Sequence, residues 1–317
     1  MITSIESAEG YDEDLAYLAA IYSSAAYCDD SNATEWRDVC ALNPACSDRT
    51  RAFTDISIYD DPATKALGFV GVDIDAHVVV AAFKGTSEVR DWITDLSTWV
   101  RYKRNCLMPA LPKPNTTIPE EFRGERGDIE NDDDGDISLG QVHHGFCEYY
   151  QSLADLGLAT RVAALAAAHL TYDVLLTGHS LGGAAATIAA VDLFRRFGVT
   201  RRRLILYTFG APRTGDGDFA AGVEAAVGRA FRLVHRRDIV PHLAPCCHDW
   251  HGACKVGDGC PYHHSEEVWY RDDMNFPGAN FTVCSDTLGE DSDCAYAVDL
   301  SVADHLYYFE IRIGGYC

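Results

Sequence analysis

Hydrophobic and polar positions alternate along the chain in two patterns, one typical of helices and the other typical of buried strands. Apolar residues recur at steps of three and four over 13–26, 148–169 and 184–194, which predicts helices. Continuous apolar runs bounded by turn residues predict strands. These runs cover 52–59, 67–73, 77–83, 172–177, 203–208, 230–235 and 306–313. Because helices alternate with buried strands, we expect an α/β fold whose central sheet is largely parallel.

The composition is compatible with one hydrophobic core. The chain has 317 residues, of which 47% are hydrophobic, and we find no internal repeat. Since α/β folds of this length often form one domain, we expect a single domain over 1–317. Two segments differ in composition and are predicted to be surface insertions. These are 107–140, rich in proline and acidic residues, and 246–260, rich in cysteine, glycine and histidine.

The sequence GHSLGG at 178–183 places a serine between glycines, directly after a predicted strand and before a predicted helix. This is the pattern of a nucleophile elbow, a sharp turn that presents the serine hydroxyl. Gly178 and Gly182 are expected to be required, since a Cβ at either position would collide with the neighbouring strand or helix. The alternative is a glycine-rich turn that only packs a helix against the sheet. The strand and helix on either side favour Ser180 as a nucleophile.

A serine nucleophile needs a histidine base and a carboxylate that orients the histidine. In elbow enzymes they follow the serine in the order acid, histidine. Asp238 comes just after the predicted strand 230–235, where a loop at the carboxyl end of the strand would bring it to the elbow. His305 precedes the predicted strand 306–313. Position alone leaves other acids and histidines open, namely Asp192, Asp249, His248, His251 and His263.

Further motifs accompany the elbow along the chain. They are GHSLGG at 178–183, TFGAPRTGD at 208–216, RDIVPHL at 237–243 and DHL at 304–306. Together and in this order they resemble the class 3 lipases, especially the secreted fungal-type triacylglycerol lipases and their feruloyl esterase relatives. The resemblance implies an α/β-hydrolase fold with a helical lid, and a catalytic triad of Ser180, Asp238 and His305.

The resemblance extends to FKGTS at 83–87, where the family commonly shows arginine in place of Lys84. It implies an oxyanion hole formed by Thr86 and by the backbone amide of Leu181. The next residues place Val89, Trp92, Ile93 and Leu96 on one side of a helix. Periodicity alone favours a helix packed on the core. The similarity of RDWITDL at 90–96 to a lipase lid implies instead an amphipathic lid that turns outward at a lipid surface.

The expected activity is therefore that of a triacylglycerol lipase acting at an oil–water interface. Phospholipase A1 and feruloyl-type carboxylesterase activities are alternatives that use the same triad. A non-catalytic binding protein on the same fold is a remote alternative, because the triad positions and Thr86 are all filled. Ile239, Val240 and Leu306 flank the triad residues and are candidates for acyl-chain contacts, with core packing as the other interpretation.

Cysteines and glycosylation motifs predict a secreted glycoprotein with disulfide bonds. The chain has 12 cysteines, and sequons begin at Asn32, Asn115 and Asn280. A net charge of −22 argues against a nucleic-acid partner, and no apolar run is long enough to span a membrane.

The family resemblance implies three disulfides: Cys28–Cys317, Cys40–Cys46 and Cys284–Cys294. Cys106 and Cys147 bracket the acidic insertion and are expected to close its base. Cys246, Cys247, Cys254 and Cys260 then pair among themselves. Zinc binding by these four thiols and the nearby histidines is the disfavoured alternative, since an oxidising compartment converts dense cysteines into disulfides.

Acidic residues at Glu130, Asp132 and Asp134 alternate before Gly135, as in calcium-binding loops. Gln141 stands where a bidentate glutamate is expected, and no predicted helices flank the segment. A solvated acidic loop is therefore favoured over calcium binding, and no metal or cofactor is expected to be required.

Overall fold

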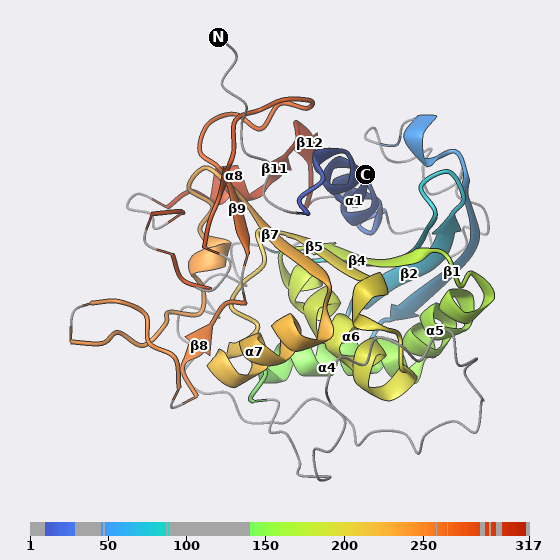
Figure 1. The fold of residues 1–317 in the computed structure, drawn as a ribbon, viewed down its shortest axis with the longest axis horizontal. Coiled ribbons are helices and arrows are strands. Elements are labelled where there is room, and N and C mark those ends of the chain that lie inside the picture. Colours follow the sequence, from blue (N-terminus) through green and yellow to red (C-terminus); the bar gives the residue numbers. More distant parts are fainter. Residues whose placement is uncertain are drawn as a thin grey trace.

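The core of the protein is an eight-stranded sheet whose central strands are parallel (Figure 1). The structure is a computed structural model, and it describes residues 10–28, 46, 48–86, 88, 140–250, 252–257, 259–264, 266–285, 289–291, 293–295 and 300–314. The strands are β1 Phe53–Asp61, β2 Ala66–Asp73, β3 Val78–Phe83, β4 Asp173–His179, β5 Leu204–Phe209, β7 Arg229–His235, β9 Glu267–Tyr270 and β10 Thr282–Val283. They lie in the order β1-β2-β3-β4-β5-β7-β9-β10. All neighbours from β3 to β9 pair in parallel, and antiparallel pairs lie at the two edges.

Helices cover both faces of this sheet (Figure 1). They are α1 Glu13–Ala25 on one face, and α4 His144–Asp155, α5 Leu158–Ala168, α6 Leu181–Phe197 and α7 Gly217–Ala226 on the other. Successive residues of β3 pack alternately on the two layers: Val79 and Ala81 lie with α4–α7, whereas Val80 and Ala82 lie with α1. Strands buried on both faces read as continuous apolar runs, which is why the sequence marks them clearly.

The predicted α/β class is confirmed, and most predicted elements are present within a few residues of their expected bounds. The single helix expected over 148–169 is wrong, because the chain forms α4 and α5 there. Gly157 separates them with φ of +104°, a conformation that breaks a helix and that glycine adopts without steric cost. Apolar residues continue at helical spacing across the break, so periodicity alone does not reveal it.

The strand expected over 306–313 is also wrong. The chain forms a hairpin of β11 (Tyr307–Tyr308) and β12 (Ile311–Arg312), outside the main sheet. Phe309 and Glu310 turn between them with φ of +51° and +60°, respectively. The other short elements are 3₁₀ turns η1 Asp48–Thr50, η3 Arg201–Arg203 and η4 Val240–His242, strands β6 Gly215–Asp216 and β8 Pro261–Tyr262, and helix α8 Val302–His305.

Disulfides join Cys246 to Cys254, Cys247 to Cys260 and Cys284 to Cys294. Cys28, Cys46 and Cys147 are disulfide-bonded as well. Their expected partners, Cys317, Cys40 and Cys106, lie outside the described residues. Within the described part of the chain, no helix is both long enough and apolar enough to cross a lipid bilayer.

Candidate active site

Ser180 lies on the sharp turn between β4 and α6, as the sequence predicts. Its backbone has φ of +59° and ψ of −127°, a strained conformation for a residue with a side chain. The flanking glycines allow β4, α6 and β3 to approach closely. A Cβ on Gly178 would lie 2.3 Å from the backbone of Gly182, and a Cβ on Gly182 would lie 2.1 Å from the carbonyl oxygen of Phe83. Neither position has room for alanine.

Asp238 follows β7 by three residues and is fully buried. Its Oδ2 accepts hydrogen bonds from the Tyr308 hydroxyl at 2.6 Å and from Nδ1 of His305 at 2.8 Å. Its Oδ1 accepts from the backbone amide of Val240 at 2.8 Å. Burial by itself raises the pKa of Asp238, but His305 and these hydrogen bonds outweigh burial and hold that pKa below its usual value. The acid is therefore a carboxylate at neutral pH.

His305 is the last residue of α8 and is also fully buried. Because a carboxylate only accepts, Nδ1 of His305 donates to Asp238, which leaves Nε2 without a proton in the neutral ring. Nε2 of His305 and Oγ of Ser180 are both buried and have no hydrogen-bond partner among the described residues. Both atoms are therefore free to act in a reaction, an arrangement also common in enzymes without bound substrate.

Ser301 joins the segments that carry Asp238 and His305. Its amide donates to the carbonyl of Arg237 at 2.7 Å, and its own carbonyl accepts from the amide of Ile239 at 3.4 Å. Its Oγ accepts from the amide of Asp304 at 3.1 Å and so caps the start of α8. Asp238 and His305 are 67 residues apart in sequence, yet they belong to one hydrogen-bonded unit.

Gly210 provides the space in which Asp238, His305 and Tyr308 meet. Its φ is +55°, and a Cβ there would lie 2.3 Å from Oδ2 of Asp238 and 2.8 Å from both Nδ1 of His305 and the Tyr308 hydroxyl. The glycine is required both by its backbone conformation and by this close approach.

The other downstream acids and histidines have different partners. Asp192 accepts from Tyr150 at 2.6 Å and from Arg196 at 3.0 Å. The remaining contacts are Asp249 with the amide of Ala253, His248 with the carbonyl of Gly252, and His263 with the carbonyl of Pro241. His251 lies outside the described residues. Of the candidate acid and base positions that the structure describes, only Asp238 and His305 contact each other.

His179 and Tyr27 extend this site and were not expected from the sequence. Nε2–H of His179 donates to the carbonyl of His305 at 2.7 Å, so its Nδ1 accepts from the Tyr27 hydroxyl at 2.8 Å. Burial, with a smaller effect of His305, lowers the pKa of His179 to about 3. Gly85 lies against both residues, since a Cβ there would be 2.1 Å from the Tyr27 hydroxyl. Tyr27 thereby connects the loop before Thr86, through His179, to the carbonyl of His305.

The expected oxyanion and substrate residues are only partly described. Thr86 follows β3 and is half-buried, with its Oγ1 accepting from the amide of Glu88 at 3.2 Å. Leu181 is the half-buried first residue of α6. Val240 is buried in the core, whereas Ile239 and Leu306 are half-buried. The expected lid residues Val89, Trp92, Ile93 and Leu96 and the acidic positions Glu130, Asp132 and Asp134 lie outside the described residues.

Comparison with known proteins connects this geometry to a family. Residues 80–248, which make up more than half of the chain and include Ser180 and Asp238, match lipase (class 3). The chain belongs to the class 3 lipase family. Over 260 residues it is 34% identical to a lipase from Rhizomucor miehei, a match that covers 81% of this chain and 57% of that protein.

Two further relatives of this class 3 lipase are similar to it in sequence, and one of them also in its solved structure. A secreted mono- and diacylglycerol lipase from Fusarium solani is 27% identical over 76% of this chain and 59% of its own length. A solved triacylglycerol lipase, whose catalytic centre is described as a serine protease triad, superposes with a TM-score of 0.69. It is 28% identical and covers 95% of both chains. The chain thus matches somewhat more than half the length of the first two relatives, and it has the α/β-hydrolase fold of the solved lipase.

Two groups of possible metal ligands occur in the described part of the chain. One contains Cys246, His248 and Cys254, and the other contains Glu267, Cys284 and Cys294. In both groups the two cysteines are bonded to each other, so their sulfurs are not thiolates. Each group therefore lacks the soft ligands that would favour zinc.

Proposed function

We propose that this protein is a serine esterase that hydrolyses carboxylic esters of lipids, most specifically triacylglycerols. The 2.8 Å hydrogen bond between His305 and Asp238, three residues from the end of a strand beside an elbow serine, is the observation that carries the proposal. Nδ1–H bonded to a buried carboxylate gives His305 the tautomer in which Nε2 can accept a proton. Nε2 of His305 and Oγ of Ser180 are both buried without a hydrogen-bond partner among the described residues, as expected of a base and a nucleophile that have not bound substrate.

In the proposed reaction, Ser180 Oγ attacks the ester carbonyl while Nε2 of His305 accepts the serine proton. The imidazolium then donates that proton to the departing alcohol, which leaves an acyl-serine. Water repeats the sequence: His305 removes its proton, the hydroxide attacks the acyl carbon, and the proton returns to Ser180 as the acid departs. Asp238 stays ionised throughout and stabilises the imidazolium.

We infer that the backbone amide of Leu181 and the Thr86 residue stabilise the oxyanion of both tetrahedral intermediates. Leu181 is the first residue of α6, where the first helical N–H groups lack partners within the helix. The partial positive charge of this helix end adds to the effect. Loss of one such donor typically costs about 3 kcal/mol of transition-state stabilisation.

The choice of substrate rests on the segment 89–100, which we propose to be an amphipathic lid. Its apolar side would cover the triad in water and contact lipid after opening. Relatives of the chain include a solved triacylglycerol lipase and a secreted mono- and diacylglycerol lipase. Disulfides and a secreted relative support secretion, and one continuous sheet supports a single domain over 1–317.

A substrate panel with a matched nucleophile variant tests the proposal. We expect emulsified triolein to be hydrolysed faster than phosphatidylcholine or methyl ferulate, with a rise in rate as droplets form. Ser180→Ala should abolish both hydrolysis and labelling by a fluorophosphonate. Labelling that survives Ser180→Ala would overturn the assignment of the nucleophile. A rate that increases smoothly through the solubility limit would overturn the lid, and a preference for phosphatidylcholine or methyl ferulate would overturn the triacylglycerol assignment.

A further inference from the structure

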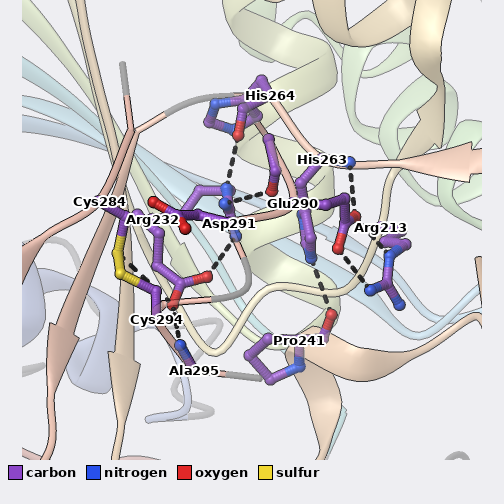
Figure 2. A network of polar contacts seen from close by, with 12 residues as sticks. Arg213, Arg232, Pro241, His263, His264, Cys284, Glu290, Asp291, Cys294 and Ala295 are labelled. Carbon is purple, nitrogen blue, oxygen red and sulfur yellow. Dashed lines mark hydrogen bonds and ion pairs between the residues drawn. A yellow bond between two sulfur atoms is a disulfide. The ribbon is translucent and has the colours of Figure 1, made fainter. Parts of the chain in front are cut away.

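A network of buried ion pairs and hydrogen bonds contacts Pro241, three residues after Asp238, and takes no part in the proposed reaction (Figure 2). We call residues 236–244 the acid loop. Arg213, in the TFGAPRTGD motif, is 5% exposed and forms a bidentate ion pair with Glu290, with bonds of 2.6 Å and 2.7 Å. A buried guanidinium is costly unless its donors are satisfied, so the remaining donors of Arg213 are informative.

Arg213 holds three consecutive carbonyl groups of the acid loop. Its backbone amide donates to Leu243 at 2.7 Å. Its Nη1 donates to His242 at 2.8 Å and to Ala244 at 2.9 Å. The guanidinium is planar and its donors have fixed directions, so pairing with Glu290 on two nitrogens sets the direction of the third. Glu290 thus orients the group that binds the loop.

His263 supplies a second contact to the same loop, and Glu290 also binds His263. Nε2–H of His263 donates to the carbonyl of Pro241 at 2.8 Å, and the backbone amide of His263 donates to Oε1 of Glu290 at 3.2 Å (Figure 2). Burial, followed by the charges of Arg232 and Arg213, lowers the pKa of His263 well below its usual value, so the ring is neutral. The Glu290 carboxylate therefore accepts hydrogen bonds from both residues that bind the carbonyl groups at 241–244, from the guanidinium of Arg213 and from the backbone amide of His263.

Glu290 is itself fixed by its surroundings. It lies between Cys284 and Cys294, which are joined by a disulfide. The preceding residue, Gly289, packs so closely on His263 that a Cβ would lie 1.7 Å from the His263 carbonyl oxygen, and its own carbonyl accepts from Arg232 at 3.0 Å. The network is thus a rigid support rather than a surface ion pair.

The support acts on the catalytic acid through a short path. Val240 donates its amide to Oδ1 of Asp238 and begins the 3₁₀ turn that His242 ends. A shift of the carbonyls at 242–244 moves this turn, and with it one of the three donors that hold the Asp238 carboxylate. Misplacement of a catalytic group by about 1 Å can lower a rate 100-fold.

We propose that Arg213, oriented by Glu290, is a positioning residue that sets the place of Asp238 relative to His305. This inference rests on the proposed serine esterase function. It adds a requirement that the triad alone does not contain: a buried arginine that touches neither the substrate nor the reacting atoms.

The test uses the full-length protein, a soluble short-chain p-nitrophenyl ester and the variants Arg213→Lys and Glu290→Gln. We expect kcat to fall at least 10-fold in each variant with KM changed less than threefold, because the acyl-binding residues are untouched. The decisive comparison places Arg213→Lys in an Asp238→Asn background. If Arg213 acts through the acid, kcat should fall less than twofold further there.

Arg203→Lys is the matched control. Arg203 also donates to three carbonyls, those of Tyr172, Ala166 and His169, but at the opposite end of β5 from the site. It should lower the melting temperature without changing kcat.

Two outcomes would overturn the positioning role. One is a kcat for Arg213→Lys within twofold of the parent while circular dichroism shows the variant folded. The other is an equal fold-loss in the parent and Asp238→Asn backgrounds. If the parent protein neither hydrolyses esters nor reacts with a fluorophosphonate, the proposed function itself fails. If the parent is active and the Arg213→Lys variant is unaffected, the positioning role fails and the proposed function stands.

Discussion

The Tyr308 hydroxyl donates to Oδ2 of Asp238 over 2.6 Å, and this is the same oxygen that accepts Nδ1–H of His305. Both donors act on one carboxylate oxygen in a fully buried site. The second oxygen is held by the amide of Val240. Three hydrogen bonds therefore stabilise the charge of the carboxylate and fix its plane while His305 is still neutral.

Replacing Tyr308 with phenylalanine removes one donor and leaves the ring in place. A hydrogen bond to a charged group contributes about 1.5–3 kcal/mol, so we expect the free energy of unfolding at pH 7 to fall by that amount. The pKa of Asp238 should rise, because the hydroxyl favours its charged form. Urea denaturation of Tyr308→Phe at pH 7 measures the loss. An unchanged denaturation midpoint would contradict the role given to this hydroxyl.

Asp238 and Asp192 offer a direct comparison of two buried acids that follow the serine. Asp238→Asn should lower kcat on the order of 10,000-fold, because an amide can stabilise the wrong tautomer of His305. Asp192→Asn should affect stability instead, since its partners are Tyr150 and Arg196. Steady-state kinetics on a soluble ester separates the two. A large loss of kcat in Asp192→Asn would reassign the acid.

Gly210→Ala should inactivate the enzyme, because the new methyl group would displace Asp238 and His305. We expect kcat to fall on the order of 100-fold or more, together with a loss of stability. Gly198→Ala is the matched control: Gly198 also has a positive φ, of +69°, but nothing lies within 4 Å of its Cβ position. It should cost about 1–2 kcal/mol of stability through backbone strain alone and leave kcat unchanged. Equal kcat values for the two variants would contradict this explanation.

Stability should fall on acidification partly because histidines are buried in the neutral form. Burial, with a smaller effect of His144, lowers the pKa of His143 to about 3. An unfolded histidine binds a proton near pH 6.5, so between these values only the unfolded state is protonated, and stability decreases as the pH falls. The contribution of one such histidine is about 1.4 kcal/mol per pH unit inside this window.

His143→Asn tests this prediction, because asparagine can still accept the amide of Phe146 at the start of α4. Denaturation at pH 6.5, 5.5 and 4.5 should show a shallower loss of stability, smaller by about 2 kcal/mol over the range. Parallel curves for the parent and the variant would show that His143 is not the source. His179 and His242, with pKa values lowered to about 3 and about 4, continue to contribute in both proteins.

The sequence allowed the elbow and its sheet to be predicted because both depend on local patterns. Strands covered on both faces are continuous apolar runs, and the elbow needs glycines at fixed offsets from Ser180. Asp238 and His305 were less accessible to such reasoning, since their pairing depends on how distant loops meet. Resemblance to a family, rather than position, separated them from the other acids and histidines.

Other features had no local signal. The break at Gly157 depends on one backbone conformation inside a sequence that favours a continuous helix. The short strand β9 was missed, although it pairs in parallel with β7. Tyr308 follows His305 by three residues, but no spacing marks a tyrosine as a donor to an acid 70 positions away. Arg213 stood in a recognised motif, and only the fold reveals that it grips the acid loop.

Ser301 joins the segments that carry Asp238 and His305, and His179, the residue before Ser180, donates to the carbonyl of His305. The main chain of all three candidate catalytic residues is therefore connected by hydrogen bonds. Oγ of Ser180 and Nε2 of His305 are the atoms without a partner among the described residues. In this geometry, side-chain rotation rather than a shift of the main chain would bring the two reactive atoms into contact.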